Sequence, residues 1–549
     1  MKRLWVVGLS FGLLAGGLQG APVIAANGIV NAASFKPVGA PGSALARGAL
    51  ASLFGAALGP AAGVSAAAFP LQTTLAGVSI RMTAGATTVN AIPVFVSAGQ
   101  INFIVPSNTP LGAVQVTVTF NNETSPPVTV QVVAVSFGIF TRAGGAGQGI
   151  IQNFVSATET PLNTPSNSAR LGQAMIAYGT GSGGISTPDN VAPPAADMNI
   201  QPLDVLVGGV PARRLYVGRS PCCAGLDQVV FELAANTPTG CYVPVIVRAG
   251  EFVSNAASIA VSASGGACTD ANNPFARILT SGGNRRIGTV SLDRTSIRFT
   301  LPGLGAIESV QDSATALFFR ADESFSNSNF TLPPLGACTV ATIRVTDAEL
   351  PVDRPLGLLD AGTPLRLTGP MGDKTIPRGT GNLYSAMLGG GLPLPGVTPP
   401  PLYLSRGRYA ISAPGGADVG AFSASTDLPD PLTWTNRNLT MVNRGQSLPI
   451  AWTGGASGDF VQIVGASSDL RLQSGGVFFC TAPVSAGSFS VPAAILSSLP
   501  VSGTEQGVPT GFLSVGTTSY GSASTFTAPG LDAAILYYIS SSGTLVEFR

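Results

Sequence analysis

The sequence of 549 residues contains no histidine. This absence excludes Ser-His-Asp and Cys-His catalysis, histidine general bases, histidine metal ligands and histidine pH switches. Charge is also scarce, because charged residues make up 10% of the chain against a usual share of ~25%. Of the 28 basic residues only Lys2, Lys36 and Lys374 are lysines, and the net charge of +1 provides no basic field. We therefore expect no binding of nucleic acid.

Long helical patterns are also missing, whereas turn-forming residues are abundant, with 69 glycines and 43 prolines. Apolar and polar residues alternate with a period of two over 114–120, 128–132, 297–301 and 365–368. Such alternation is typical of half-buried antiparallel strands. We therefore predict an all-β protein made of β-sandwich units.

The N-terminus has the pattern of a secretory signal peptide over residues 1–25. A short basic segment precedes the apolar stretch 4–18, and small residues follow. We predict cleavage near Ala25, with Gly20 as the second choice. A membrane anchor is the alternative, but this stretch is shorter than the ~20 apolar residues that a spanning helix needs. We expect an exported protein, secreted or at the cell surface, with no transmembrane segment after cleavage.

The six cysteines are an even number in a chain with an export signal, and this predicts disulfides. Four of them lie close together in the sequence, and we expect two local bridges, with the pairing left open, among Cys222, Cys223, Cys241 and Cys268. The two distant cysteines, Cys338 and Cys480, are then predicted to pair with each other. Zinc would need four thiolates, and the one close pair is adjacent rather than C-x-x-C, so we expect no metal site.

An internal repeat indicates two related units in the first half of the chain. Segments 100–105 and 228–233 both begin a strand with glutamine and place phenylalanine three positions later. We therefore predict two immunoglobulin-like sandwiches, over residues 26–140 and 141–265.

The second half has fewer internal landmarks. A small polar stretch at 266–275 has the composition of a linker. Beyond it we predict a β-rich domain over 276–430 and a C-terminal β-sandwich over 431–549. Segments 448–452 and 460–464 are expected to be paired strands of that last domain.

The repeat region carries several ordered motifs. They include Asn27-Gly-Ile-Val-Asn-Ala-Ala-Ser-Phe35, Leu53-Phe-Gly55, Leu71-Gln-Thr-Thr-Leu-Ala-Gly-Val78, Ser97-Ala-Gly-Gln-Ile-Asn-Phe-Ile-Val-Pro106, Ala177-Tyr-Gly-Thr-Gly181 and Val207-Gly-Gly-Val-Pro211. Residues 27–265 thereby resemble the tandem Ig-like (IPT/TIG-like) domain of exported acidobacterial proteins, the Solibacter-type uncharacterised C-terminal domain family. The resemblance implies an immunoglobulin-like sandwich in an extracellular setting. It implies no catalytic residue, because the family has no established activity. The family's domain usually ends a long protein, whereas here it begins one, and we therefore look for a special function in residues 275–549.

A glycine-rich segment, Gly179-Thr-Gly-Ser-Gly-Gly184, formally matches the dinucleotide fingerprint G-x-G-x-x-G. That fingerprint requires a following helix whose amides face the pyrophosphate, and Ile185-Ser-Thr-Pro188 does not begin one convincingly. We interpret the segment as a sandwich turn and expect no cofactor.

The densest acidic cluster offers the carboxylates that a glycosidase without histidine would need. Its members are Glu308, Asp312, Asp322, Glu323, Asp347, Glu349 and Asp353. Sequence spacing in loops does not establish two carboxyls facing one bond. We expect solvated turns and no catalytic residue, and a carboxylate-based polysaccharide hydrolase in 275–430 is the alternative.

Two tryptophans remain after removal of the signal peptide. Trp452 alternates with Ile450 and Leu448 on one strand face, and we expect it in a core. Trp434 lies between threonines and close to prolines, where an exposed ring would stack against the apolar face of a sugar. We predict that Trp434 is the ligand contact.

Together these features predict an exported, non-catalytic protein that binds or scaffolds at the cell surface or outside the cell. The expected partner is a polysaccharide or a cell-envelope protein, bound by loops and strand faces of the C-terminal half. The hydrolase alternative predicts release of reducing sugar. A third alternative, a structural spacer, predicts no saturable binding at all.

Overall fold

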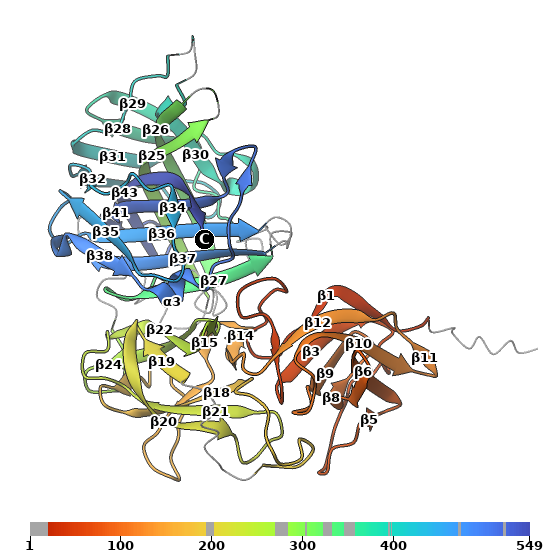
Figure 1. Ribbon diagram of the computed structural model, residues 1–549. Helices are drawn as coiled ribbons and strands as arrows, with labels where there is room; N and C mark the ends of the chain where they lie inside the picture. Colours follow the sequence, from red (N-terminus) through yellow and green to blue (C-terminus); the bar gives the residue numbers. More distant parts are fainter. Residues whose placement is uncertain are drawn as a thin grey trace, which may run out of the picture.

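The computed structural model describes residues 20–193, 203–269, 284–301, 303, 305–321, 332–344, 357–393, 396, 398–469, 474–519 and 523–549. Regular structure in these residues consists of strands, apart from the short helix α3 (Ala493–Leu496) and the 3-10 turns η2 (Thr380–Asn382) and η3 (Val484–Ala486). The prediction of an all-β protein is therefore confirmed. The strands form three bodies, with one body standing over two smaller ones that lie side by side (Figure 1).

The first body, sandwich 1, consists of two facing sheets. One sheet has the order β1 (Val23–Asn31), β3 (Leu50–Ala56), β9 (Gln100–Ile104), β8 (Ile92–Val96) and β4 (Val64–Ser65). The other has the order β2 (Leu45–Ala46), β12 (Val128–Val133), β10 (Gly112–Phe120), β6 (Val78–Ala84) and β5 (Thr74–Leu75), with β11 (Glu123–Thr124) and β7 (Thr87–Asn90) at its margins. The alternation read in the sequence is visible in β10, where Val114, Val116 and Val118 are buried between the sheets.

Strand β1 bears on the position of signal cleavage. Val23 and Ile24 both pair with β3, and Ile24 is buried in the core of sandwich 1. Cleavage after Ala25 would remove both residues from the sheet, whereas cleavage after Gly20 would keep them. Both cleavage positions stay predictions. Most of the predicted signal peptide, residues 1–19, lies outside the described residues.

The second body, sandwich 2, curls one continuous sheet around its core. Its main path is β13 (Gly138–Ile139), β18 (Ala174–Thr180), β21 (Asp227–Glu232), β20 (Val210–Arg219), β19 (Leu203–Val207), β22 (Gly240–Ala249), β24 (Ala257–Ser262), β15 (Ala146–Gly149) and β14 (Thr141–Ala143). Short strands β16 (Ile151–Asn153), β17 (Ala169–Arg170) and β23 (Phe252–Val253) attach to β18, β24 and β22. The glycine-rich segment begins with the last two residues of β18 and continues without a helix, in agreement with its interpretation as a turn.

The C-terminal body is organised by a ten-stranded sheet. Its path is β27 (Cys338–Arg344), β37 (Ser474–Pro483), β36 (Phe460–Asp469), β41 (Gly511–Thr518), β43 (Ala533–Phe548), β25 (Arg285–Leu301), β26 (Gly305–Ala321) and β30 (Tyr384–Gly391), with β34 (Met441–Val442) and β42 (Ser524–Phe526) beside β43. Smaller sheets consist of β29 (Gly372–Ile376), β28 (Leu365–Gly369), β31 (Gly407–Ala413) and β32 (Phe422–Leu428); of β33 (Thr433–Trp434), β35 (Leu448–Thr453) and β38 (Ser488–Val491); and of β39 (Thr504–Glu505) with β40 (Val508–Pro509).

The division of the second half at residue 430 does not hold in the structure. Strand β25 pairs in parallel with β43, from Ile287 opposite Ala533 to Arg298 opposite Thr544. Strands from both sides of residue 430 therefore share one sheet. The composition of a chain segment does not reveal a pairing between strands that lie so far apart in the sequence, and for this reason the expected boundary was wrong.

Two cores lie on the same face of the ten-stranded sheet. Leu536 and Tyr538 of β43 belong to the core under the four-stranded sheet, and Val546 and Phe548 belong to the core under β33, β35 and β38. Because side chains two residues apart share a face of a strand, all four point the same way. The second core also contains Ile246, from sandwich 2, so apolar packing continues between these bodies.

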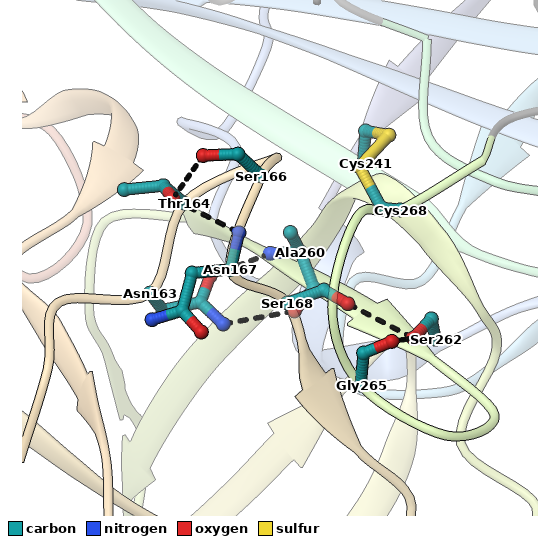
Figure 2. The surroundings of a disulfide bond; sticks show 10 residues. All are labelled: Asn163, Thr164, Ser166, Asn167, Ser168, Cys241, Ala260, Ser262, Gly265 and Cys268. Atoms are coloured by element: carbon teal, nitrogen blue, oxygen red, sulfur yellow. Dashed lines mark hydrogen bonds between the residues drawn. A yellow bond between two sulfur atoms is a disulfide. The ribbon is translucent and has the colours of Figure 1, made fainter.

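The disulfides follow the predicted scheme. Cys338 and Cys480 lie directly opposite each other on β27 and β37 and are bonded, which confirms the prediction for the distant pair. The two local bridges are Cys222–Cys223 and Cys241–Cys268. Figure 2 shows the second of these beside the loop 163–168, whose Pro165 carbonyl accepts a hydrogen bond from the Cys268 amide at 2.8 Å. Among the described residues no cysteine is free.

We predict that removal of the Cys338–Cys480 bridge by a double serine substitution lowers the free energy of unfolding by about 3–5 kcal/mol, because a bridge across a long loop restricts the unfolded chain most. The two residues are 142 positions apart. The matched control is the double serine substitution of Cys222 and Cys223, which are adjacent and should contribute about 1 kcal/mol or less. Calorimetric unfolding of both variants measures the difference, and equal losses would contradict the prediction.

Candidate functional site

Sandwich 1 and sandwich 2 are joined by buried polar contacts. The Nδ2 of Asn31 donates to the carbonyls of Ser136 and Thr180, at 3.3 and 3.2 Å. The Oγ1 of Thr180 accepts from the amide of Leu50 and donates to the carbonyl of Gly225, both at 2.7 Å. Buried polar groups are costly to leave unpaired, so these bonds fix how the two sandwiches meet.

A buried ion pair occupies the same interface. The side chains of Arg219 and Asp227 are almost completely buried and pair with each other. Arg219 also donates to the carbonyl of Gly183 at 2.8 Å, and Asp227 accepts from the amides of Gly181 and Ser182, each at 2.8 Å. The amides and carbonyl of the glycine-rich segment are thus used inside the protein. These hydrogen bonds to Arg219 and Asp227 hold the glycine-rich segment in place, so we assign the segment a structural role.

A cavity of about 460 Å³ lies where the three bodies meet, and we call it the junction cavity. Sandwich 1 contributes the turn around Gly39–Gly42, and sandwich 2 contributes Glu251 and Phe252. The lining from the C-terminal body consists of Arg444, Gly445, Asp469, Ser497, Pro500, Val501 and Arg549. Small-molecule sites in proteins are typically clefts of roughly 300–1,000 Å³ and often form between domains. The junction cavity has both properties.

Lys36 does not line the junction cavity, but it links two segments that do. Its side chain is buried, and its Nζ donates to the carbonyl of Pro41 at 2.8 Å and to that of Val253 at 2.6 Å. Pro41 lines the cavity from sandwich 1, and Val253 follows Phe252 of the lining from sandwich 2. Burial lowers the pKa of Lys36 to about 7. Lysine suits this position because, unlike arginine, it can lose its charge.

Arg444 faces the junction cavity from the C-terminal body. Its Nη1 donates to the carbonyls of Leu499 and Ser497, at 2.5 and 3.4 Å, beyond the end of α3. Its Nε is shielded from solvent and has no hydrogen-bond acceptor among the residues that the structure describes. Burial lowers the pKa of Arg444. The other arginine of the lining, Arg549, donates through Nε to Glu547 at 2.6 Å.

The structure describes two of the seven members of the acidic cluster, Glu308 and Asp312. Glu308 pairs with Arg437 at 2.8 Å, and the hydrogen bond from Ser296, followed by that from Arg437, lowers the pKa of this carboxyl. Asp312 is buried and accepts both Nε and Nη2 of Arg294 at 2.7 Å, together with two backbone amides. The other members, Asp322, Glu323, Asp347, Glu349 and Asp353, lie outside the described residues.

The two described carboxylates of the cluster lie on one strand. Glu308 and Asp312 are four residues apart on β26, so their Cα atoms are about 13 Å apart at ~3.3 Å per residue. Both side chains also serve arginines, which indicates a role in holding the C-terminal body together.

Asp293 is a carboxyl that the sequence did not single out. Burial raises the pKa of Asp293 to about 6, although the hydrogen bond from Ser291 at 2.7 Å opposes the shift. Because neighbouring strand residues point to opposite faces, Asp293 faces away from the Arg294–Asp312 pair. A raised pKa suits a general acid, but no second carboxylate faces Asp293 from β26. A single aspartate within an alternating strand carries no sequence signal for such burial.

The prediction that Trp434 contacts a ligand is wrong. Trp434 is only 4% exposed, lies opposite Trp452 in the paired strands β33 and β35, and donates through Nε1 to Asn436 at 2.8 Å. The threonines on either side of Trp434 suggested an exposed strand, but alternation turns those neighbours outward and the indole inward. Trp452 is buried in the same core, as predicted.

The described residues contain no group of three or more His, Cys, Asp or Glu side chains placed to hold a metal ion. None of the helices in the described part of the chain is long and apolar enough to cross a membrane.

Comparisons with known proteins supply no family. No family model and no curated protein matches the chain. Among solved structures, the plexin A4 extracellular region is 12% identical with a TM-score of 0.16, covering 45% of this chain and 19% of that one. A titin Ig tandem is 8% identical with a TM-score of 0.12, covering 40% of this chain and 90% of that one. SGBP-B, from a xyloglucan utilization locus in Bacteroides uniformis, is 11% identical with a TM-score of 0.16, covering 67% and 86%.

This chain therefore spans only about a fifth of the plexin chain's length. At such TM-scores the likenesses carry no argument about function. The functional interpretation rests on the residues of this chain.

We predict that Lys36→Met removes a pH dependence of stability. Between pH 7 and 10.5 the unfolded chain holds a proton on Lys36 that the folded chain does not, so wild-type stability should rise with pH in this window, by at most about 1.4 kcal/mol per pH unit. The methionine variant should lose this contribution. Denaturant unfolding between pH 7 and 9.5 measures the slope. Lys374→Met, at an exposed lysine, is the control and should keep it.

We also predict that Trp434→Ala lowers the free energy of unfolding by about 3–5 kcal/mol, because a large buried side chain is removed. Binding of polysaccharide by the folded variant should be unchanged. Fluorescence of the remaining Trp452 follows unfolding of the C-terminal body directly. A stable variant with weakened sugar binding would restore Trp434 as a ligand contact.

Proposed function

We propose that this protein is an exported, non-catalytic binding protein that holds an external ligand in the junction cavity. The observation that carries the proposal is a cavity of ligand size with walls from all three bodies. The walls belong to bodies joined by buried hydrogen bonds and a shared apolar core, so little ordering is required when a ligand enters.

We propose that the protein works outside the cell. Support comes from three disulfides, which persist in oxidising compartments, and from the signal-like N-terminus. The resemblance of residues 27–265 to the tandem Ig-like domain of exported acidobacterial proteins agrees with that setting. We therefore propose that the protein is exported and that residues 27–265 belong to that family.

A polysaccharide is the partner that we propose. The described lining comes mostly from turns and connecting segments, which combine apolar surface at Pro41, Phe252 and Val501 with charged groups. Sugars offer apolar ring faces and many hydroxyls, and such a mixed lining can contact both. A peptide added as an extra strand would require a free strand edge. A cell-envelope protein is the alternative partner.

We also propose that the protein catalyses no reaction. It is supported by the arginine partners and the separation of Glu308 and Asp312, and by the isolation of Asp293 from both. The test is direct, because a polysaccharide hydrolase would release reducing sugar from its substrate. Sustained release by the purified protein, lost on substitution of a carboxylate, would contradict the non-catalytic proposal.

We predict that the exported chain binds saturably to at least one member of a panel of insoluble polysaccharides and cell envelopes. Val501→Trp should abolish binding, because Val501 is 46% exposed in the lining and an indole there would fill the cavity. Leu215→Trp is the matched control, since Leu215 is 41% exposed on β20 and does not line the cavity. Pull-down isotherms of the three proteins measure the effect.

Saturable binding that Val501→Trp leaves intact would move the site away from the junction cavity. Absence of saturable binding to every member of the panel would contradict the proposal and favour a spacer role.

A further inference from the structure

Cys222 and Cys223 are neighbours in the sequence and are bonded to each other in the turn between β20 and β21. A bridge between adjacent residues closes a very small loop, so it restricts the unfolded chain little and adds little stability. The other two bridges join residues that are 27 and 142 positions apart. Stability therefore accounts for those two bridges and leaves the adjacent pair to be explained.

The adjacent pair is also the accessible bridge. Cys222 is exposed and Cys223 is half-buried. The four cysteines of the other two bridges are buried, with exposed fractions between 0% and 8%. Thiol–disulfide exchange begins when a thiolate reaches one of the two bonded sulfurs, so its rate depends on access. In the folded protein an external thiol therefore reaches the adjacent pair, whereas the fold shields the other two bridges.

A hydroxyl group is placed to assist cleavage of this bridge. The Oγ of Ser220 lies 3.3 Å from the Sγ of Cys222, and Ser220 is the donor because a bonded sulfur carries no proton. This hydrogen bond stabilises the thiolate that forms on Cys222 when the S–S bond breaks, and a more stable thiolate leaves faster. The contact thus makes Cys222 the leaving group and Cys223 the sulfur that is attacked.

The turn that holds the pair is part of the contact between sandwich 2 and sandwich 1. It lies between Arg219 and Asp227, which form the buried ion pair of that contact. The carbonyl of Gly225 accepts the hydrogen bond from Thr180, and the Cα of Gly225 packs so closely that an added Cβ would lie 3.0 Å from the Cγ of Leu50. Cleavage of the bridge therefore frees a turn that both sandwiches share.

Independently of the proposed function, we propose that the Cys222–Cys223 bridge is a redox-active modification site, which an external dithiol reduces in the folded protein, and that reduction loosens the turn. A thiolate of the dithiol bonds to the Sγ of Cys223, the S–S bond breaks, and its electron pair leaves on the Sγ of Cys222, which takes up a proton. The second thiolate of the dithiol attacks the dithiol's own sulfur in the mixed disulfide, and Cys223 leaves as a thiolate and is protonated. The dithiol thereby loses two electrons and two protons and becomes a disulfide, and the two cysteines become thiols.

The test is thiol trapping on the native full chain. The protein is treated with dithiothreitol, quenched at intervals with N-ethylmaleimide and mapped by peptide mass spectrometry. Label on Cys222 and Cys223 should appear at least about ten times faster than label on the four buried cysteines, and this preference should shrink in the denatured chain, where access no longer differs. Equal rates in the native protein, or a preference that is just as large after denaturation, would overturn the proposal.

The role of Ser220 is tested with Ser220→Ala, which should slow reduction of the adjacent pair about fivefold, the effect of one hydrogen bond. Ser182→Ala is the matched control, because the Oγ of Ser182 is buried in the same interface and has no partner among the described residues. Its rate should equal that of the wild type. If Ser220→Ala does not fold, glutathione decides the matter in the wild type. The trapped intermediate should carry glutathione on Cys223 and maleimide on Cys222, and the reverse would overturn this assignment.

Hydrogen exchange measures the response of the turn. Backbone amides of 219–227 should exchange at least about threefold faster after reduction and return to their first rate after reoxidation with glutathione disulfide. The double serine variant of Cys222 and Cys223 is the control, and its exchange should not respond to dithiothreitol. Reduction of the wild type without any change in exchange would overturn the loosening of the turn.

Discussion

The parallel pairing of β25 with β43 is the constraint on which the rest of the architecture depends. It places the beginning of the C-terminal half beside its end, in the ten-stranded sheet against which the smaller sheets of this body pack. Both cores then lie on one face of that sheet, and the core under β33, β35 and β38 extends to sandwich 2 through Ile246. The segments that carry Arg444 and Val501 reach the tandem sandwiches because of this closure.

Polar contacts complete the positioning that apolar packing begins. Asn31 and Lys36 of sandwich 1 donate to carbonyls of sandwich 2, and Thr180 of sandwich 2 accepts from the amide of Leu50 in sandwich 1. Hydrogen bonds are directional, so they define one relative orientation, whereas apolar surfaces tolerate sliding. A cavity with walls from three bodies keeps a defined shape only if the bodies are held in this way.

The sequence predicted what is local or follows from elimination, and missed what depends on distant partners. Strand alternation gave the all-β class, and the isolation of Cys338 and Cys480 from the other cysteines gave their bond. The boundary at 430 and the exposure of Trp434 were wrong, because both depend on strands that pair across long separations. Lys36 and Arg444 carry no motif, and their interest arises only when three bodies surround them. One signal was available for Lys36, since this chain uses arginine at 25 of its 28 basic positions.

Lys36 and Arg444, two of the cations beside the junction cavity, differ in how the fold satisfies them. Lys36 is buried, donates to two carbonyls and can become neutral, so the fold itself satisfies it. Arg444 is half-buried, donates through Nη1 to the carbonyls of Leu499 and Ser497, and has its Nε buried without an acceptor among the described residues. The Nε atoms of Arg219 and Arg286 are also buried without an acceptor among the described residues, so an unpaired Nε does not by itself mark a ligand site.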